Sequence, residues 1–197
     1  MSRLIVITDD AIRLDEVGCW LELLAAGVEK LHIRKPKASK EELECLVKEV
    51  PQEWRKKLVI HYQPELAEKY ELGGLHVSFK DYTQYKNCAV PVSCSVHNWE
   101  EAREVIDSCV YCFISPVFDS ISKTDYTANE ELKQVPVDLS NKKIYALGGI
   151  NSDNAGQALR NGYYGVVALG YVWNYRESAA ERVKELLLAV NKENVLR

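Results

Sequence analysis

The chain has 197 residues, of which 47% are hydrophobic and 27% are charged, and its formal net charge at pH 7 is -4. This length is enough for one well-buried core, and the composition is ordinary for a soluble globular protein. The slightly acidic balance gives no reason to expect nucleic acid or a membrane as a partner, and no apolar run approaches the roughly 20 residues of a membrane span.

The N-terminus and the cysteines both favour a cytoplasmic protein. The first ten residues turn acidic after one short apolar run, which is not the pattern of a secretory signal peptide. Six cysteines without a framework of spacings are then expected to be reduced and mostly buried. Cys109 and Cys112 form a lone C-x-x-C pair, and no second pair completes a zinc site.

The first half of the chain alternates between short apolar runs and helical patterns. Residues 4–8 predict a strand, and residues 14–26 predict a helix whose apolar side chains share one face. A second strand at 30–34 precedes Ser39 and Glu42, which form a capping box and predict a helix start. The alternation continues with strands at 58–60 and 74–77 and helical segments at 64–70 and 81–86.

The second half repeats this alternation until the end of the chain. The predicted strands are 91–95, 111–114, 144–146 and 164–168, and the predicted helices are 98–108, a brief one near 130, 151–161 and 178–191. Eight strands in strict alternation with helices predict a parallel sheet, and eight repeats in about 200 residues fit a compact (β/α)8 TIM barrel. We therefore expect an α/β protein with one domain over residues 1–197. An open doubly wound sheet is the alternative, but the first strand lacks its glycine fingerprint.

Two strand ends near the end of the chain carry glycine. Gly148 and Gly149 follow one strand, and Gly170 follows the next. A (β/α)8 barrel keeps its phosphate site at this point, and paired glycines let backbone N–H groups approach a ligand closely. Asn151 or Ser152 is expected to cap the following helix. An ordinary strand–turn–helix corner explains these glycines equally well.

Four histidines, at positions 32, 61, 76 and 97, lie in or just after strands. A four-histidine zinc site is conceivable, but there is no spacing signature for one, and a strand residue that points outward cannot be a ligand. The sequence therefore favours histidines that belong to the core over a metal cluster.

Two groups of polar residues could bind anions. Ser120 and Ser122 precede Lys123 in a long loop, and hydroxyls beside a lysine can hold a phosphate or pyrophosphate. Arg34, with Lys35 and Lys37, offers a second anionic subsite. A solvated polar loop and a solvated run of charge are the alternative explanations.

These stretches together resemble the thiamine phosphate synthase/TenI superfamily of small (β/α)8 barrels over essentially the whole chain. The matching stretches are I-V-I-T-D (5–9), H-I-R (32–34), G-L-H-V (74–77) with Asp81, S-V-H (95–97), S-P-V-F-x-S-x-S-K (115–123) and A-L-G-G-I-x-x-x-N (146–154). The last two stretches, in this order and at this spacing, are quite specific to the family.

The resemblance implies an enzyme of thiamine biosynthesis. A synthase of this family is a transferase that joins a hydroxymethylpyrimidine pyrophosphate to a thiazole phosphate and releases pyrophosphate, with Mg2+ as cofactor. Its partners are therefore small phosphorylated molecules, and a homo-oligomer is left open. On the family pattern, the residues that bind these groups are Arg34 and Lys123 for the pyrophosphate, Ser95 to orient it, Asp81 for Mg2+, and Ser120, Ser122, Gly148, Gly149 and Gly170 around the thiazole phosphate.

The chain departs from the synthase pattern at two places. Pro36 stands where the synthases carry a lysine, and His61-Tyr62 stands where they carry Asn-Asp. The second change removes a carboxylate, which weakens a Mg2+ site. We favour the synthase because most anion-binding residues remain and because Lys35 or Lys37 could replace the missing lysine.

Two alternatives to the synthase follow from these departures. A TenI-like thiazole tautomerase needs no pyrophosphate site and no cofactor, and His61 or His97 would serve as its acid/base group. The proposed catalytic histidine of that branch, however, falls where this chain has Pro116. The third alternative is a non-catalytic protein that binds thiazole phosphate or thiamine phosphate.

Overall fold

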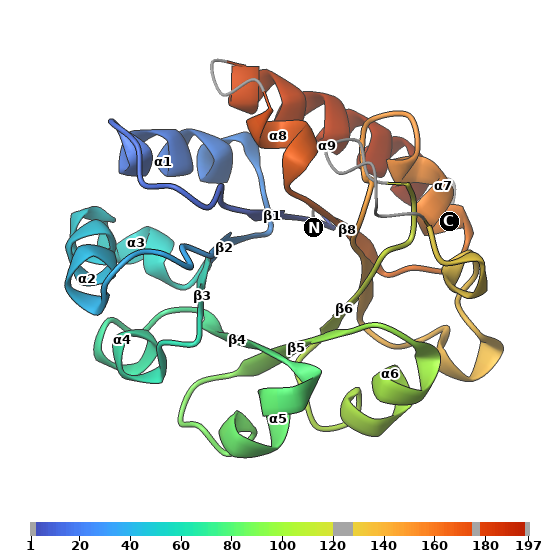
Figure 1. The fold of residues 1–197 in the computed structure, drawn as a ribbon. Helices are drawn as coiled ribbons and strands as arrows, with labels where there is room; N and C mark the ends of the chain where they lie inside the picture. Colours follow the sequence, from blue (N-terminus) through green and yellow to red (C-terminus); the bar gives the residue numbers. More distant parts are fainter. Residues whose placement is uncertain (1–2, 120–127, 175–177, 196–197) are drawn as a thin grey trace.

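The computed structural model describes residues 3–119, 128–174 and 178–195, which form a closed barrel of eight parallel strands (Figure 1). The strands are β1 (Leu4–Ile7), β2 (Lys30–Ile33), β3 (Leu58–His61), β4 (Gly74–Ser78), β5 (Val92–Val96), β6 (Cys112–Ile114), β7 (Ile144–Ala146) and β8 (Gly165–Ala168). Each strand pairs with the next in the chain, and β8 pairs with β1 to close the sheet. The predicted (β/α)8 barrel is confirmed, and the open sheet is wrong.

The helices pack around the outside of the barrel, as Figure 1 shows. They are α1 (Glu16–Ala26), α2 (Lys40–Glu49), α3 (Gln52–Arg55), α4 (Pro64–Lys69), α5 (Phe79–Tyr85), α6 (Trp99–Val105), α7 (Ala155–Arg160), α8 (Gly170–Trp173) and α9 (Ala179–Val195). Short 3-10 turns at Glu130–Leu132 and Val137–Leu139 lie between β6 and β7. The four-residue helices α3 and α8 were not predicted, because one helical turn leaves no periodic pattern. Within the described residues, no helix is long and apolar enough to cross a membrane.

The strands bury side chains on both faces, which explains their continuous apolar sequences. Leu4 and Val6 of β1 pack outward in the large core beneath the helices, whereas Ile5 and Ile7 pack in the barrel interior. The interior cluster also contains Tyr111, Phe113, Tyr145 and Val167. The barrel is therefore filled with side chains, and several of them are aromatic.

The predicted helix starts at 14, 81 and 151 differ from the structure, which has them at Glu16, Phe79 and Ala155. The helix after β7 begins at Ala155 rather than at Asn151, because the side-chain carbonyl of Asn151 accepts hydrogen bonds from the N–H groups of Asp153 and Asn154. These bonds close a turn ahead of the helix. The first helix begins at Glu16 rather than at 14, after Asp15 in a left-handed conformation.

The six cysteines are free thiols, as expected, but only Cys94 and Cys112 are buried. Cys45 is exposed, and the other three are half-buried. Burial raises the pKa of the Cys109 thiol to about 12, so it is protonated and unreactive at neutral pH.

The capping box of α2 is formed as predicted, and it gives a stability test. The Ser39 hydroxyl accepts the Glu42 N–H (3.1 Å), and the Glu42 carboxylate accepts the Ser39 N–H (2.8 Å). We expect Ser39→Ala to lower the free energy of unfolding by about 1 kcal/mol, measured by urea denaturation. Ser39→Asp keeps a capping oxygen and should stay close to wild type; an equal loss in both variants would contradict the role of the cap.

Candidate functional site

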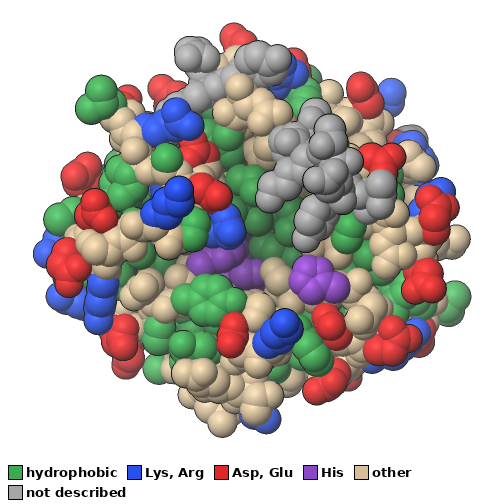
Figure 2. Space-filling view, viewed as in Figure 1, with side chains coloured by type: hydrophobic (Ala, Val, Ile, Leu, Met, Phe, Trp, Pro, Cys, Tyr) green, Lys and Arg blue, Asp and Glu red, His purple; other side chains and the backbone are tan. Residues whose placement is uncertain are grey.

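The C-terminal ends of the strands carry the polar residues, around a depression at the centre of the barrel. Figure 2 shows histidine rings inside this depression, with basic and acidic side chains near them. His32, His61, His76 and Ser95 come from the neighbouring strands β2 to β5. The catalytic ends of (β/α)8 barrels are built in this way.

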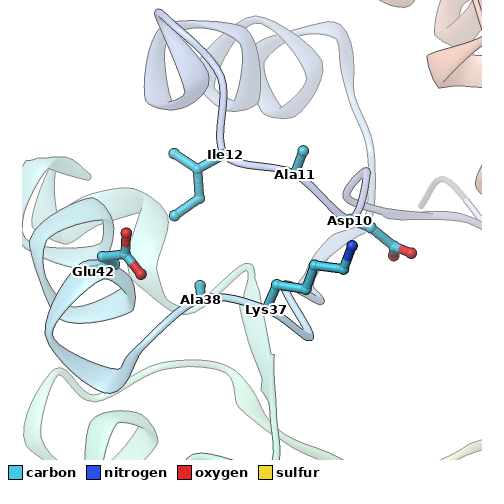
Figure 3. A pocket seen from close by; sticks show the side chains of 6 residues that line it. All are labelled: Asp10, Ala11, Ile12, Lys37, Ala38 and Glu42. Carbon is cyan, nitrogen blue, oxygen red and sulfur yellow. The ribbon is translucent and has the colours of Figure 1, made fainter.

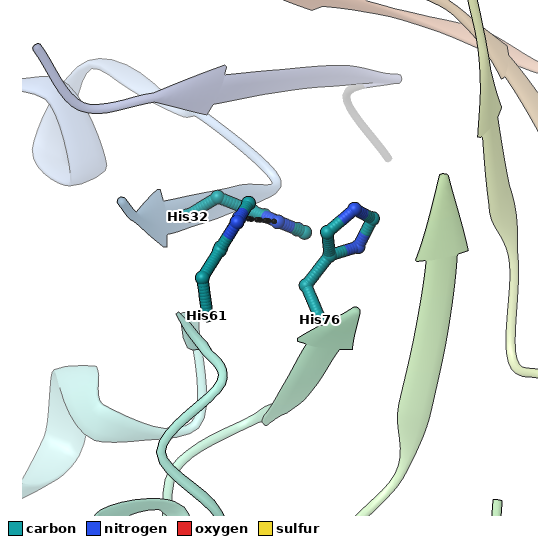
Figure 4. Close-up of side chains that lie close together, drawn as sticks. All are labelled: His32, His61 and His76. Carbon is teal, nitrogen blue, oxygen red and sulfur yellow. Dashed lines mark hydrogen bonds between the residues drawn. The ribbon is translucent and has the colours of Figure 1, made fainter. Parts of the chain in front are cut away.

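Three of the four histidines converge in the barrel (Figure 4). His32 Nδ1 lies 3.2 Å from His61 Nε2, and the rings of His61 and His76 have centroids 4.6 Å apart. His32 and His76 are buried, at 0% and 2% exposure, while His61 is half-buried. The expectation that the histidines are core residues is confirmed for His32 and His76, whose ring nitrogens have side-chain partners.

Hydroxyl groups hold these rings in place. His32 Nε2 lies 2.9 Å from Tyr111 Oη, and His76 lies between two serines, with Nδ1 2.8 Å from Ser93 Oγ and Nε2 2.7 Å from Ser95 Oγ. The Ser93 hydroxyl donates to the carbonyl of Leu75, so it accepts the proton of His76 Nδ1. His76 Nε2 then accepts the hydroxyl proton of Ser95, which fixes the neutral tautomer of the ring.

Burial keeps the three interior histidines neutral. Desolvation lowers the pKa of His32 and of His61 well below the ordinary value and lowers that of His76 to about 3. The neighbouring rings add to the effect for His32 and His61. At neutral pH each of these rings is therefore uncharged and keeps one nitrogen lone pair, which accepts a hydrogen bond or can bind a metal ion.

Asp81 lies at the rim, where Tyr62 and Ser78 bind its carboxylate. The hydroxyls of Tyr62 and Ser78 both donate to Asp81 Oδ2, at 3.1 and 2.6 Å. Tyr62 also accepts the backbone N–H of Ser78 at 2.9 Å, which fixes the phenol above the end of β4. Tyr62, one of the departures from the synthase pattern, therefore directly contacts the predicted Mg2+ ligand.

Arg34 directly follows β2, and its side chain forms an ion pair with Asp10. The loops after β1 and β2 are tied together, because the Arg34 N–H donates to Thr8 Oγ1 and this hydroxyl donates to the Arg34 carbonyl. A cavity of about 310 Å3 is lined by Arg34, His61 and Tyr62, among others. This volume is in the range of small-ligand pockets.

Lys35 and Lys37 lie in different environments. Lys35 Nζ is buried, 2.6 Å from Glu16 Oε1, and donates to the carbonyl of Ala11. Its amine is therefore paired inside the fold, although Lys35 also lines the cavity beside Arg34, and its expected role in binding phosphate stays a prediction. Lys37 is exposed and lines a second cavity of about 320 Å3, together with Asp10 (Figure 3).

Glycines follow β7 and β8, and they matter in two ways. Some are packed too closely to carry a side chain, and all offer backbone N–H groups at the barrel mouth. Gly148 has φ 98 and Gly149 has φ 64, and a Cβ on Gly149 would lie 2.2 Å from the carbonyl oxygen of Asp119. Within the described residues, no acceptor takes the backbone N–H of Gly148, Gly149 or Gly170. Because β7 and β8 are neighbours, these donors lie at one side of the barrel mouth.

The remaining predicted residues lie elsewhere. His97 follows β5 on the surface, with Nδ1 3.2 Å from the carbonyl oxygen of Ser115, and is not part of the histidine cluster. Ser120, Ser122 and Lys123 lie outside the described residues. Sequence reasoning missed Ser93 in β5 and Tyr111 directly before β6, whose only signal was a hydroxyl group beside apolar residues.

Comparisons with known proteins agree with this architecture. Residues 4–171 match the family model described as thiamine monophosphate synthase. A thiamine phosphate pyrophosphorylase from Bacteroides thetaiotaomicron is 29% identical with a TM-score of 0.79, covering 97% of this chain and 98% of that one. A thiamine phosphate pyrophosphorylase from Pyrococcus furiosus is 23% identical with a TM-score of 0.77, covering 97% and 96%, and at this identity the likeness concerns the fold alone. No curated protein matches the chain.

Proposed function

The chain belongs to the thiamine monophosphate synthase family, and from this premise we propose that it joins a hydroxymethylpyrimidine pyrophosphate to a thiazole phosphate. In this reaction a thiazole nitrogen attacks the methylene carbon of the pyrimidine, and the bond from this carbon to the pyrophosphate breaks. The electron pair of that bond leaves with the pyrophosphate. Such a step needs cations at the leaving group and a separate site that fixes the second substrate.

The observation that carries the proposal is the set of backbone N–H groups at the ends of β7 and β8. Gly148, Gly149 and Gly170 offer donors without an acceptor among the described residues, at the place where (β/α)8 barrels bind phosphate. These donors would hold the thiazole phosphate. Arg34, which exchanges its partner Asp10 for the substrate, would hold the pyrophosphate together with Lys123, and Ser95 would orient it.

The described residues offer one protein ligand for Mg2+, the carboxylate of Asp81. Asp81 Oδ2 already accepts two hydroxyls, whereas Oδ1 has no partner in the described part of the chain. One carboxylate oxygen suffices for an ion that is otherwise held by phosphate oxygens and water. Bound there, Mg2+ would neutralise charge on the departing pyrophosphate.

A thiazole tautomerase is the second candidate, and the Tyr62–Asp81 hydrogen bond favours it. Tyr62 stands where the synthases carry a second carboxylate, and its hydroxyl donates to the first one, Asp81. The chain therefore offers fewer ligands for Mg2+ bound to pyrophosphate. His61 or His97 would then move a proton on a carboxylated thiazole phosphate, because a neutral imidazole accepts a proton at one nitrogen and donates one from the other.

An assay with both synthase substrates and Mg2+ tests the proposal, with thiamine phosphate and pyrophosphate measured in parallel. Equal amounts of the two products support the synthase. Isomerisation of the carboxylated thiazole without thiamine phosphate identifies a tautomerase. Binding of thiazole phosphate or thiamine phosphate without turnover, measured by calorimetry, identifies the non-catalytic protein.

Lys123→Ala is expected to lower the synthase rate by about 100-fold or more, because a cation that binds the leaving group acts mainly in the transition state. The melting temperature should not change. Lys133→Ala removes an exposed lysine whose ion-pair partner in the described part of the chain is Glu130, and it serves as the control. A melting temperature that falls along with the rate would assign Lys123 a structural role instead.

A further inference from the structure

The histidine cluster is unusual for the inside of a small barrel. Branched apolar residues normally fill this space, yet here His32, His61 and His76 follow one another on β2, β3 and β4. One ring nitrogen of each histidine lies within 4.8 Å of one from each of the others. The synthase and tautomerase reactions do not explain why three rings converge at this place.

The spacing of the first two rings fits a shared metal ion. Two ligands of a tetrahedral ion with metal–nitrogen bonds of about 2.0–2.1 Å lie about 3.3–3.4 Å apart. His32 Nδ1 and His61 Nε2 lie 3.2 Å apart, and Figure 4 shows their rings directed toward one another. An ion placed between them would replace their hydrogen bond with little movement of either ring.

The third ring needs a change of orientation. Both nitrogens of His76 face β5, where they bind Ser93 and Ser95. A half-turn of the imidazole about its bond to Cβ exchanges the positions of Nδ1 and Cδ2, which directs a nitrogen toward the other two rings. This rotation gives up the hydrogen bonds to Ser93 and Ser95 in exchange for the metal ion, and it keeps the position of the ring and its stacking on Phe113, whose centroid is 4.6 Å away.

The surroundings of the cluster are those of a metal site. A ligating histidine usually donates its second N–H to a protein oxygen, and His32 has Tyr111 Oη 2.9 Å from Nε2 for this purpose. All three rings are neutral at pH 7, which is the form that binds metal. Imidazole nitrogen suits zinc, and also copper, nickel and iron, better than Mg2+ or Ca2+.

The cluster is also accessible from the site. His61 is half-buried and lines the cavity of about 310 Å3 beside Arg34. A metal ion could enter through this cavity. Because the three imidazoles are neutral, the ion would keep its charge of +2. Its fourth coordination position would be open to water, hydroxide or an anionic group of a bound small molecule.

We propose that His32, His61 and His76 bind one divalent transition-metal ion, Zn2+, at the floor of the barrel mouth. This site is separate from Asp81, and it is compatible with the synthase or with a tautomerase that uses His97, because a metal-bound His61 has no free lone pair to accept a proton.

Titration of the metal-free full-length protein with Zn2+ and with Co2+ tests the proposal. Calorimetry with Zn2+ should give one ion per chain, and Co2+ should produce the visible absorption of a tetrahedral ion. Binding of less than one ion per chain, or Co2+ absorption of an octahedral ion in water, would overturn the proposal.

Two single variants locate the ion. His61→Ala should weaken Zn2+ binding by about 100-fold or more, since loss of even a supporting residue beyond the ligands costs about 10–100-fold. His97→Ala removes the surface histidine outside the cluster and should leave the affinity unchanged. Equal affinities in wild type and His61→Ala, or a loss in His97→Ala, would place the ion elsewhere and refute the assignment.

A second variant keeps the test valid if His61→Ala does not fold. His61→Asn retains a polar group of similar reach in the half-buried position, and circular dichroism establishes whether it is folded. A folded His61→Asn that binds Zn2+ as tightly as wild type contradicts the proposal, and a folded variant with weakened binding supports it.

Discussion

Replacing Lys35 by methionine is expected to lower the free energy of unfolding by about 3–5 kcal/mol, although its neighbours in the chain are the half-buried Arg34 and the exposed Pro36. The side chains of Lys35 and Glu16 are 0% and 2% exposed, and their charged atoms are 2.6 Å apart. Methionine fills a similar volume but leaves the Glu16 carboxylate buried without its cation. The indole N–H of Trp20 still donates to this carboxylate at 2.9 Å, but a neutral donor does not replace a charge.

Urea denaturation of Lys35→Met and Lys37→Met measures this difference. Lys37 is exposed, so its substitution should change the free energy of unfolding by no more than about 0.5 kcal/mol. The double variant Glu16→Gln with Lys35→Met removes both charges and should recover part of the loss. Similar small effects for Lys35→Met and Lys37→Met would mean that the Lys35 amine is free to bind a ligand.

The two lysines illustrate what the sequence could not predict. Both flank Pro36 and both belong to a basic run, so local pattern assigns them the same anion-binding role. The buried partner of Lys35 lies 19 residues earlier, at the start of α1. Only the packing of the loop after β2 against α1 separates the structural lysine from the exposed one.

The barrel itself could be predicted, because short continuous apolar runs alternate along the chain with helical patterns. The convergence of the histidines could not. A parallel strand buried on both faces has no polar–apolar alternation, so the sequence does not say which side chains point inward. The register of the sheet pairs His76 with His61 on one side and with Ser93 on the other, and the ring of His32 reaches His76 from β2, across β3.

The glycine turn after β7 is explained by packing before any ligand is considered. Gly149 has φ 64, and its backbone faces the segment before residue 120, with the Phe118 carbonyl carbon 2.8 Å from an ideal Cβ. This segment is fastened to the turn, because Phe118 N–H donates to the Gly148 carbonyl at 3.2 Å and Val117 N–H donates to the Leu147 carbonyl at 3.0 Å. A side chain at 149 would therefore push away the start of the loop that carries Ser120, Ser122 and Lys123.

Gly149→Ala is accordingly expected to lower the free energy of unfolding by about 2–5 kcal/mol, from left-handed strain and from overpacking against Phe118 and Asp119. Gly27→Ala is the matched control: its φ is also positive, at 111, but the nearest atom to a Cβ is Leu187 Cδ1 at 3.8 Å. Strain without crowding should cost that variant only about 1–2 kcal/mol.

Urea denaturation of both variants, with calorimetry of thiazole phosphate binding, separates the two roles of the turn. Equal destabilisation would show that the loop does not press on Gly149. Unchanged affinity for thiazole phosphate in a folded Gly149→Ala would remove this turn from the phosphate site, because the displaced N–H groups could no longer be its donors.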